Sequence, residues 1–128
     1  MYLRFVVPEK DEESGREMGI FVAGGILNDG GELYDYEIKL RKKILTWFSN
    51  NLKVPDVQAS ESNYYSNPNA ISWFKSSAAV HISKMREYVE ILESHDIQVK
   101  QLVTERPGKI VYEDEYQVAA IPFKDTFK

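Results

Sequence analysis

The clearest periodic pattern in this sequence runs over residues 77–94. Apolar side chains recur there at alternating steps of four and three, which places them along one face of an α-helix. The residues that form this stripe are Ala78, Ile82, Met85, Val89 and Leu92. Ser76, just before the helix, is a plausible N-cap. A helix with a single apolar stripe has to bury it against another layer of structure.

Two earlier segments also predict helices. Residues 32–52 place their apolar side chains on about half of the helical circumference, a width typical of a helix that packs against a sheet or several neighbours. Residues 17–27 favour a helix as well. In that segment Gly19, Gly24 and Gly25 each cost about 1 kcal/mol relative to alanine.

Five segments predict β-strands because they are rich in β-branched and aromatic residues or alternate between apolar and polar side chains. They are residues 2–7, 70–75, 97–104, 109–112 and 116–121, and the charged residues 9–16 predict a loop. The order is therefore β-α-α-β-α-β-β-β. It predicts an α+β fold with the helices packed on one face of a mixed or antiparallel sheet, which ends in a three-strand meander.

The chain has 128 residues, which is the length of one ordinary domain, so we expect a single globular domain over 1–128. Residues 53–69 form a long polar stretch with Pro55 and Pro68 and no helical or strand period. Unstructured connections of this length are uncommon in compact domains and tend to be functional or disordered. Tyr64 and Tyr65 lie inside it, and we expect this pair to pack down or to bind a partner.

Several classes of chemistry lack the residues they need. There is no cysteine, which excludes disulfides, thiolate zinc sites and a cysteine nucleophile. Gly24-Gly25 and Gly30-Gly31 lack the spacing of a phosphate-binding loop, and the common hydrolase, zinc-protease and kinase motifs are missing. We therefore expect no metal and no cofactor.

The charge balance disfavours two kinds of partner. With 16 Lys and Arg against 20 Asp and Glu, the formal net charge is −4. The densest basic run, Lys39 to Lys43, scatters around a helix instead of forming a stripe, so no nucleic-acid partner is expected. No apolar run approaches the ~20 residues of a membrane helix, and the start lacks the features of a signal peptide. These observations predict a cytoplasmic protein with no membrane partner.

One flank of the helix at 77–94 is the first candidate site. Ser77, His81, Lys84, Tyr88 and His95 fall on the same side of it. Such a row could serve proton transfer or ligand binding, or it could be the border where half-buried polar groups meet water. The second interpretation is favoured, because no acidic residue of the row is placed to orient an imidazole. The two histidines are also too far apart along the helix to share a metal.

The acidic tip Glu113, Asp114 and Glu115 is the second candidate. Clustered carboxylates can hold a divalent cation or act as an acid–base pair. Adjacent strand residues point to opposite faces, however, and the other ligands of a calcium loop are missing. A charged hairpin turn that keeps the sheet edge soluble is the favoured interpretation.

The aromatic residues are more numerous than one small core clearly needs. Tyrosine and tryptophan are enriched in protein interfaces, where they supply contact area and a polar group. We expect Trp47 and Trp73 to lie in the core. The remaining candidates for a binding surface are Tyr34, Tyr36, Tyr64, Tyr65, Tyr112 and Tyr116.

Several stretches resemble a group of short bacterial proteins of unknown function. They are residues 2–7 (YLRFVV), 70–75 (AISWFK) and 112–118 (YEDEYQV), followed by 122–126 (PFKDT). The resemblance extends over nearly the whole chain. It implies a bacterial, cytoplasmic, single-domain protein, and it implies no catalytic residue, cofactor or partner.

Three functions remain open from the sequence. The leading hypothesis is a non-catalytic domain that associates with itself or with another protein through Tyr64 and Tyr65. The second is a small acidic protein that neutralises a basic enzyme, as immunity proteins and antitoxins do, because a net negative charge speeds encounter with a positive partner. The third is an enzyme or small-ligand binder that uses His81 and Tyr88.

Overall fold

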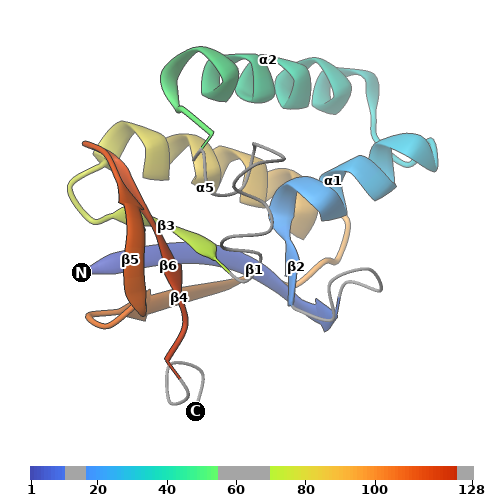
Figure 1. The fold of residues 1–128 in the computed structure, drawn as a ribbon. Helices are drawn as coiled ribbons and strands as arrows, with labels where there is room; N and C mark the ends of the chain where they lie inside the picture. The colour runs from blue at the N-terminus through green and yellow to red at the C-terminus, as the bar shows by residue number, and fades with distance from the viewer. Residues whose placement is uncertain (11–16, 55–69, 124–128) are drawn as a thin grey trace. The chain divides into compact units, whose positions relative to one another are not determined.

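The computed structural model describes residues 1–10, 17–54 and 70–123 (Figure 1). Its helices in this part are α1 (Ile20–Asp29), α2 (Asp35–Asn51) and α5 (Ala79–Glu93). Its strands are β1 (Tyr2–Lys10), β2 (Glu17–Gly19), β3 (Ile71–Lys75), β4 (Lys100–Thr104), β5 (Lys109–Glu113) and β6 (Gln117–Ile121). The predicted α+β class and the order of the predicted elements are confirmed.

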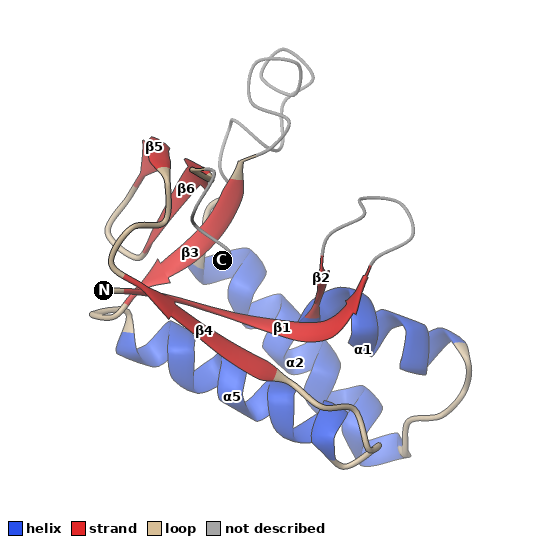
Figure 2. Ribbon diagram, turned by 90° about the horizontal axis from the view of Figure 1, so that it is seen from below, coloured by secondary structure: helices blue, strands red, loops and turns tan. Residues whose placement is uncertain are grey.

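The strands form one sheet in the order β2-β1-β3-β6-β5, with β4 paired to β1. The pairs β1–β2, β1–β3, β3–β6 and β5–β6 are antiparallel. Figure 2 shows β3, β6 and β5 beside one another. Of the three strands that follow α5, β5 and β6 pair with each other and β4 returns to the first strand.

The sequence pattern missed β2. Val6 and Val7 of β1 pair with Gly19 and Met18, so β1 extends to Lys10 into the predicted loop, and residues 17–19 are a strand instead of the first turn of a helix. Residues 17–19 form a strand because they pair with β1. Pairing between two strands satisfies the backbone groups of a segment whose own helical tendency is weakened by glycine.

The chain divides into two compact units, each assembled from separate stretches. One consists of Met1–Arg4, Leu52–Ile82 and Val103–Lys128, and the other of Phe5–Asn51 and Ser83–Leu102. We call them the sheet unit and the helical unit. The sheet unit holds β3, β5 and β6, whereas the helical unit holds α1, α2, β2 and most of β1 and α5. The expectation of a single domain over 1–128 stays a prediction.

In the sheet unit, β6 is the most deeply buried strand. Residues 117–120 are buried at four successive positions, so both faces of the strand are covered. Trp73 of β3 lies opposite Val118 and is also buried, as predicted for this tryptophan. The turn before β5 contains Gly108 at φ +130°, where a Cβ would overlap the Ile121 carbonyl group. Glycine is therefore required in the Pro107-Gly108 turn.

In the helical unit, α2 and α5 run antiparallel. Glu37 bonds Ser94, Arg41 bonds Tyr88, and the Lys84 ammonium lies over the Trp47 ring, so the residue numbers rise along α2 as they fall along α5. α1 joins this pair through Phe21. The Phe21 ring meets Phe48 and Tyr88 edge-on, at centroid distances of 5.5 and 4.9 Å.

Helix α1 carries glycine where it meets Tyr88. Gly24 is buried, and a Cβ built on it would overlap the phenol of Tyr88. The predicted helix at 17–27 is thus present but begins at Ile20. The cost of Gly24 to the helix is offset by the close approach that it permits.

The turn that follows helix α5 contains a residue in the left-handed region. Asp96 has φ +62°, and the Ile97 N–H donates to the Leu92 carbonyl at 3.1 Å. This is the bonding of a Schellman motif, in which glycine is the usual residue at the left-handed position. At the other end the helix begins at Ala79, so Ser76 is not its N-cap.

Candidate functional site

The main polar feature of the helical unit is the buried carboxylate of Glu37. Only 2% of this residue is exposed. Glu37 lies in the first turn of α2, and its Oε1 accepts a 2.9 Å hydrogen bond from the Tyr34 N–H. A glutamate that bonds back to the residue before its helix forms half of a capping box.

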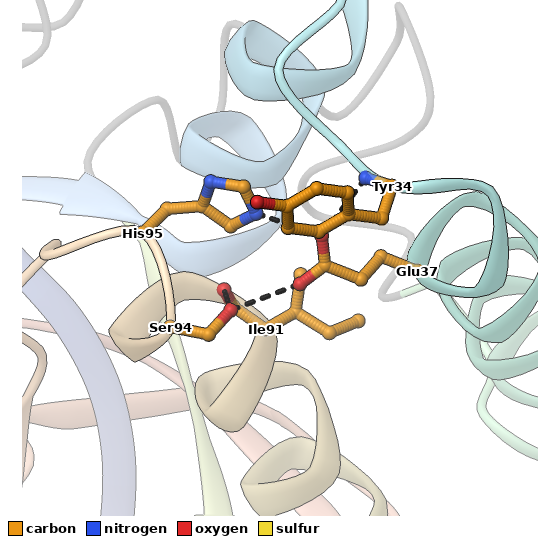
Figure 3. A network of polar contacts seen from close by, with 5 residues as sticks. All are labelled: Tyr34, Glu37, Ile91, Ser94 and His95. Atoms are coloured by element: carbon orange, nitrogen blue, oxygen red, sulfur yellow. Dashed lines mark hydrogen bonds and ion pairs between the residues drawn. The ribbon is translucent and has the colours of Figure 1, made fainter.

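Two side chains from the end of α5 complete the environment of this carboxylate (Figure 3). The Ser94 hydroxyl lies 2.9 Å from Oε2, and His95 Nε2 lies 2.8 Å from Oε1. The Ser94 hydroxyl is also 2.7 Å from the Ile91 carbonyl oxygen. Glu37 therefore connects the beginning of α2 to the end of α5. We call Tyr34, Glu37, Ser94 and His95 the Glu37 clasp.

Hydrogen bonding keeps this buried group ionised. Burial acts to raise the pKa of Glu37, but the hydrogen bonds from His95, the Tyr34 N–H and Ser94 more than offset it. The pKa of Glu37 is consequently lower than its ordinary value.

The Glu37 clasp has part of the geometry of an acid–base site. A carboxylate that orients an imidazole is what a general base needs. However, the single Ser94 O–H faces two acceptors, the Glu37 carboxylate and the Ile91 carbonyl, so the described contacts do not form a nucleophile–imidazole pair. The arrangement joins two helices and fixes the backbone of Tyr34.

Two exposed tyrosines, one of them Tyr34 of the Glu37 clasp, lie at the beginning of α2. Tyr34 is 65% exposed and Tyr36 is 67% exposed, yet their rings stack within 4° of parallel at a centroid distance of 6.2 Å. The Tyr34 ring also lies 6.0 Å from the His95 ring. We call Tyr34 and Tyr36 the tyrosine pair. A large, ordered aromatic surface in solvent is typical of a contact surface.

The segments that meet at the Glu37 clasp are strongly acidic. Residues 26–38 and 90–99 contain no lysine or arginine. Their acidic residues are Asp29, Glu32, Asp35, Glu37, Glu90, Glu93 and Asp96. All of these except Glu37 are exposed, so this end of the helical unit presents negative charge to solvent.

The helical unit also contains a pocket of about 330 Å³, which we call the α1 pocket. Its apolar lining comes from β1, β2, α1 and the segment after α5: Val7, Pro8, Met18, Ala23, Ile26, Leu27 and Ile97. Glu9 and Asp96 add two carboxylates to the lining. This volume is at the lower end of the ~300–1,000 Å³ range of ligand pockets.

The residues of the predicted helix flank differ in their burial and in their partners. His81 is buried in the sheet unit, stacked on Tyr116 at 4.2 Å, whereas Tyr88 is fully buried in the helical unit. Lys84 lies 3.5 Å from Glu87, and Ser77 is exposed. The buried Tyr88 hydroxyl accepts from Arg41 Nε at 3.0 Å. Burial raises the pKa of Tyr88, and Arg41 offsets only part of the increase.

The acidic tip contains a carboxylate that holds the turn. Asp114 Oδ1 accepts the N–H groups of Tyr116 and Gln117 at 2.8 and 3.0 Å, and Oδ2 accepts the Tyr112 hydroxyl at 2.8 Å. Burial opposes ionisation of Asp114, but these bonds lower its pKa below the ordinary value. Glu113 pairs with Lys75. These contacts fit the favoured interpretation of a charged hairpin turn.

Tyr64 and Tyr65 lie outside the described residues, so the predicted binding role of this pair stays a prediction. The sequence pattern did not single out Glu37, the α1 pocket or the pairing of Tyr34 with Tyr36. The sequence signature of a capping box has Ser, Thr, Asp or Asn three residues before the glutamate, and Tyr34 occupies that position, so this signal could not have indicated Glu37. The contact with His95, 58 residues away, has no local signal.

Comparisons with protein-family models, with curated proteins and with solved structures each found no match. Within residues 1–10, 17–54 and 70–123, no helix is long and apolar enough to cross a membrane. No group of three or more His, Cys, Asp or Glu side chains in those ranges is placed to hold a metal ion. The class of protein is therefore defined only by its fold and its surface. It is an α+β domain whose helical unit has an acidic end with two exposed tyrosines.

Proposed function

We propose that this chain is a non-catalytic protein-binding domain, and that the tyrosine pair is the centre of its binding surface. The observation that carries the proposal is the parallel stacking of two tyrosines that are both about two-thirds exposed. Stacked rings supply contact area at a low cost in side-chain entropy, because each has few rotatable bonds.

The Glu37 clasp supports this function by holding the surface in place before binding. The Tyr34 backbone N–H is bonded to a carboxylate that is itself fixed by Ser94 and His95. A preorganised contact surface loses less entropy on binding than a mobile one.

The charge around the tyrosine pair favours a basic partner over a second copy of the chain. A twofold dimer through this surface would bring two acidic ends together, which is unfavourable. A partner rich in lysine or arginine would instead gain ion pairs and cation–π contacts with the rings. This observation also favours the second candidate function, a small acidic protein that neutralises a basic enzyme. A bacterial origin and a cytoplasmic location are part of the same proposal.

Native mass spectrometry of the chain, purified from its own host at low ionic strength, tests the proposal. We expect a complex with one basic protein, which is lost in the variant Tyr34→Ser/Tyr36→Ser and released by added salt. Val80→Ser is the matched control, because Val80 is 59% exposed on a different helix, α5. It should keep the complex.

A bare monomer mass, a homodimer or an acidic partner would contradict the proposed function. So would a partner that is lost equally from Val80→Ser. Circular dichroism of both variants checks that the fold is intact, because the substituted side chains are mainly in solvent and contribute little to stability.

A further inference from the structure

We infer that the α1 pocket binds a small organic cation, an alkyl chain that ends in an ammonium or guanidinium group. This site goes beyond the proposed protein surface and does not depend on it. The argument rests on the shape of the α1 pocket, the chemistry of its lining and the charge of the segments that form it.

The lining of the α1 pocket separates into an apolar part and a charged part. Seven apolar side chains from four parts of the helical unit surround it, the charged side chains are Glu9 and Asp96, and Gln98 is the remaining polar residue. Neither carboxylate belongs to an ion pair among the described residues. No lysine, arginine or histidine is part of the lining.

This combination selects the ligand class. The apolar lining favours burial of a short hydrocarbon chain, at about 25 cal/mol per Å². Two carboxylates favour a positive head group and disfavour an anion, because the described lining contains no compensating positive charge. The volume of about 330 Å³ admits a short chain instead of a large ring system.

The charges of the segments around the α1 pocket also favour a cation over an anion. Asp96 lies next to His95 of the Glu37 clasp, and residues 26–38 and 90–99 carry acidic residues without lysine or arginine. A negative surface raises the local concentration of cations near the pocket entrance. The same field would repel a carboxylate or a phosphate.

A titration followed by ¹H–¹⁵N NMR tests the inference with three probes of equal chain length: n-butylammonium, n-butanol and n-butyrate. We expect saturable shifts at Met18, Ile97 and their neighbours for the cation. Its affinity should be about 3- to 10-fold higher than that of butanol, as partly exposed charge pairs provide. Butyrate should bind more weakly than butanol.

Two conservative variants identify the charges responsible. Glu9→Gln and Asp96→Asn should each reduce the preference for butylammonium over butanol by about 2- to 5-fold. Asparagine tolerates the left-handed conformation of residue 96, so the turn is kept. Glu93→Gln is the matched control, since it removes an exposed carboxylate outside the lining and should leave the preference unchanged.

The inference is overturned if butanol binds as tightly as butylammonium, or if shifts fail to saturate. It is also overturned if both variants keep the full preference, or if the shifted residues lie away from the α1 pocket. Lysine with a blocked backbone serves as a fourth probe. Tighter binding of blocked lysine than of butylammonium assigns the cation to a protein side chain, and weaker binding assigns it to a free amine.

Discussion

At the scale of the residue, Glu37 shows how a charge can be kept inside a small protein. An unpaired buried carboxylate would be protonated or would destabilise the fold, because burial removes its hydration. Here the Tyr34 N–H, Ser94 and His95 replace the lost water. The bonds from Ser94 and His95 join two helices, and the bond from Tyr34 fixes the backbone beside the tyrosine pair, so one side chain serves both stability and positioning.

Replacing Glu37 by glutamine should destabilise the protein by about 1–3 kcal/mol at neutral pH, since it weakens bonds to a charged acceptor. The pKa of Glu37 is lower in the folded chain than its ordinary value. The carboxylate therefore contributes stability above the ordinary pKa, and this contribution is lost as the pH falls through the folded value. Urea unfolding at a series of pH values should show the difference between wild type and Glu37→Gln shrinking below about pH 4.

Glu32→Gln provides the control for this measurement, because Glu32 is exposed beside the same helix. It should change the free energy of unfolding by less than about 0.5 kcal/mol. A constant difference between wild type and Glu37→Gln from neutral to acid pH would show that the carboxylate carries no charge-dependent stabilisation.

At the scale of the element, helix α1 depends on packing more than on its own propensity. Three of the ten residues from Ile20 to Asp29 bury their side chains or backbone against neighbours: Ile20, Ala23 and Gly24. From the sequence alone, a glycine in the middle of a helix predicts a lower helix propensity. In the structure the missing side chain of Gly24 leaves room for the Tyr88 phenol, which is bonded to Arg41.

The adjacent glycines of α1 should respond to alanine in opposite directions. Gly24→Ala should destabilise by about 1–3 kcal/mol, because the added methyl overlaps the Tyr88 phenol. At Gly25 the added Cβ would lie 3.6 Å from Arg41 Nη2, an ordinary contact. Gly25→Ala should therefore stabilise by up to about 1 kcal/mol through helix propensity.

Thermal unfolding of both variants measures the two effects under identical conditions. Equal stabilisation by the two substitutions would mean that Tyr88 does not approach α1 as closely as the structure shows.

At the scale of the whole molecule, stability is distributed unevenly across the sheet. The strand path ends at β2 and β5, whereas β6 lies between β3 and β5 and has ladder partners on both sides. Val118, Ala119 and Ala120 are completely buried. A strand in this position opens to solvent only when its neighbours separate.

Hydrogen exchange should therefore be slowest at residues 118–120 and much faster in β5 on the edge. The measurement is amide exchange followed by NMR, with each rate corrected for its intrinsic value. The two strands belong to the same unit, so the comparison does not depend on the rest of the chain. Equal protection in β5 and β6 would contradict the assignment of β6 as the central strand of its unit.

The elements that a reader of the sequence could predict are those set by local periodicity. The apolar stripe of residues 77–94 predicted α5 because a helix repeats its faces every 3.6 residues. The strands at 71–75, 109–113 and 117–121 were indicated by β-branched and aromatic residues. The Pro107-Gly108 turn was predicted because few residues other than glycine adopt positive φ.

The tertiary structure alone decided the candidate sites. Glu37 and His95 are 58 residues apart, and no local pattern indicates that an acid on one helix will orient an imidazole at the end of another. Likewise the α1 pocket draws its lining from four separate parts of the chain. Periodicity reports which side of an element is apolar, whereas a site depends on which elements meet, and long-range packing determines that.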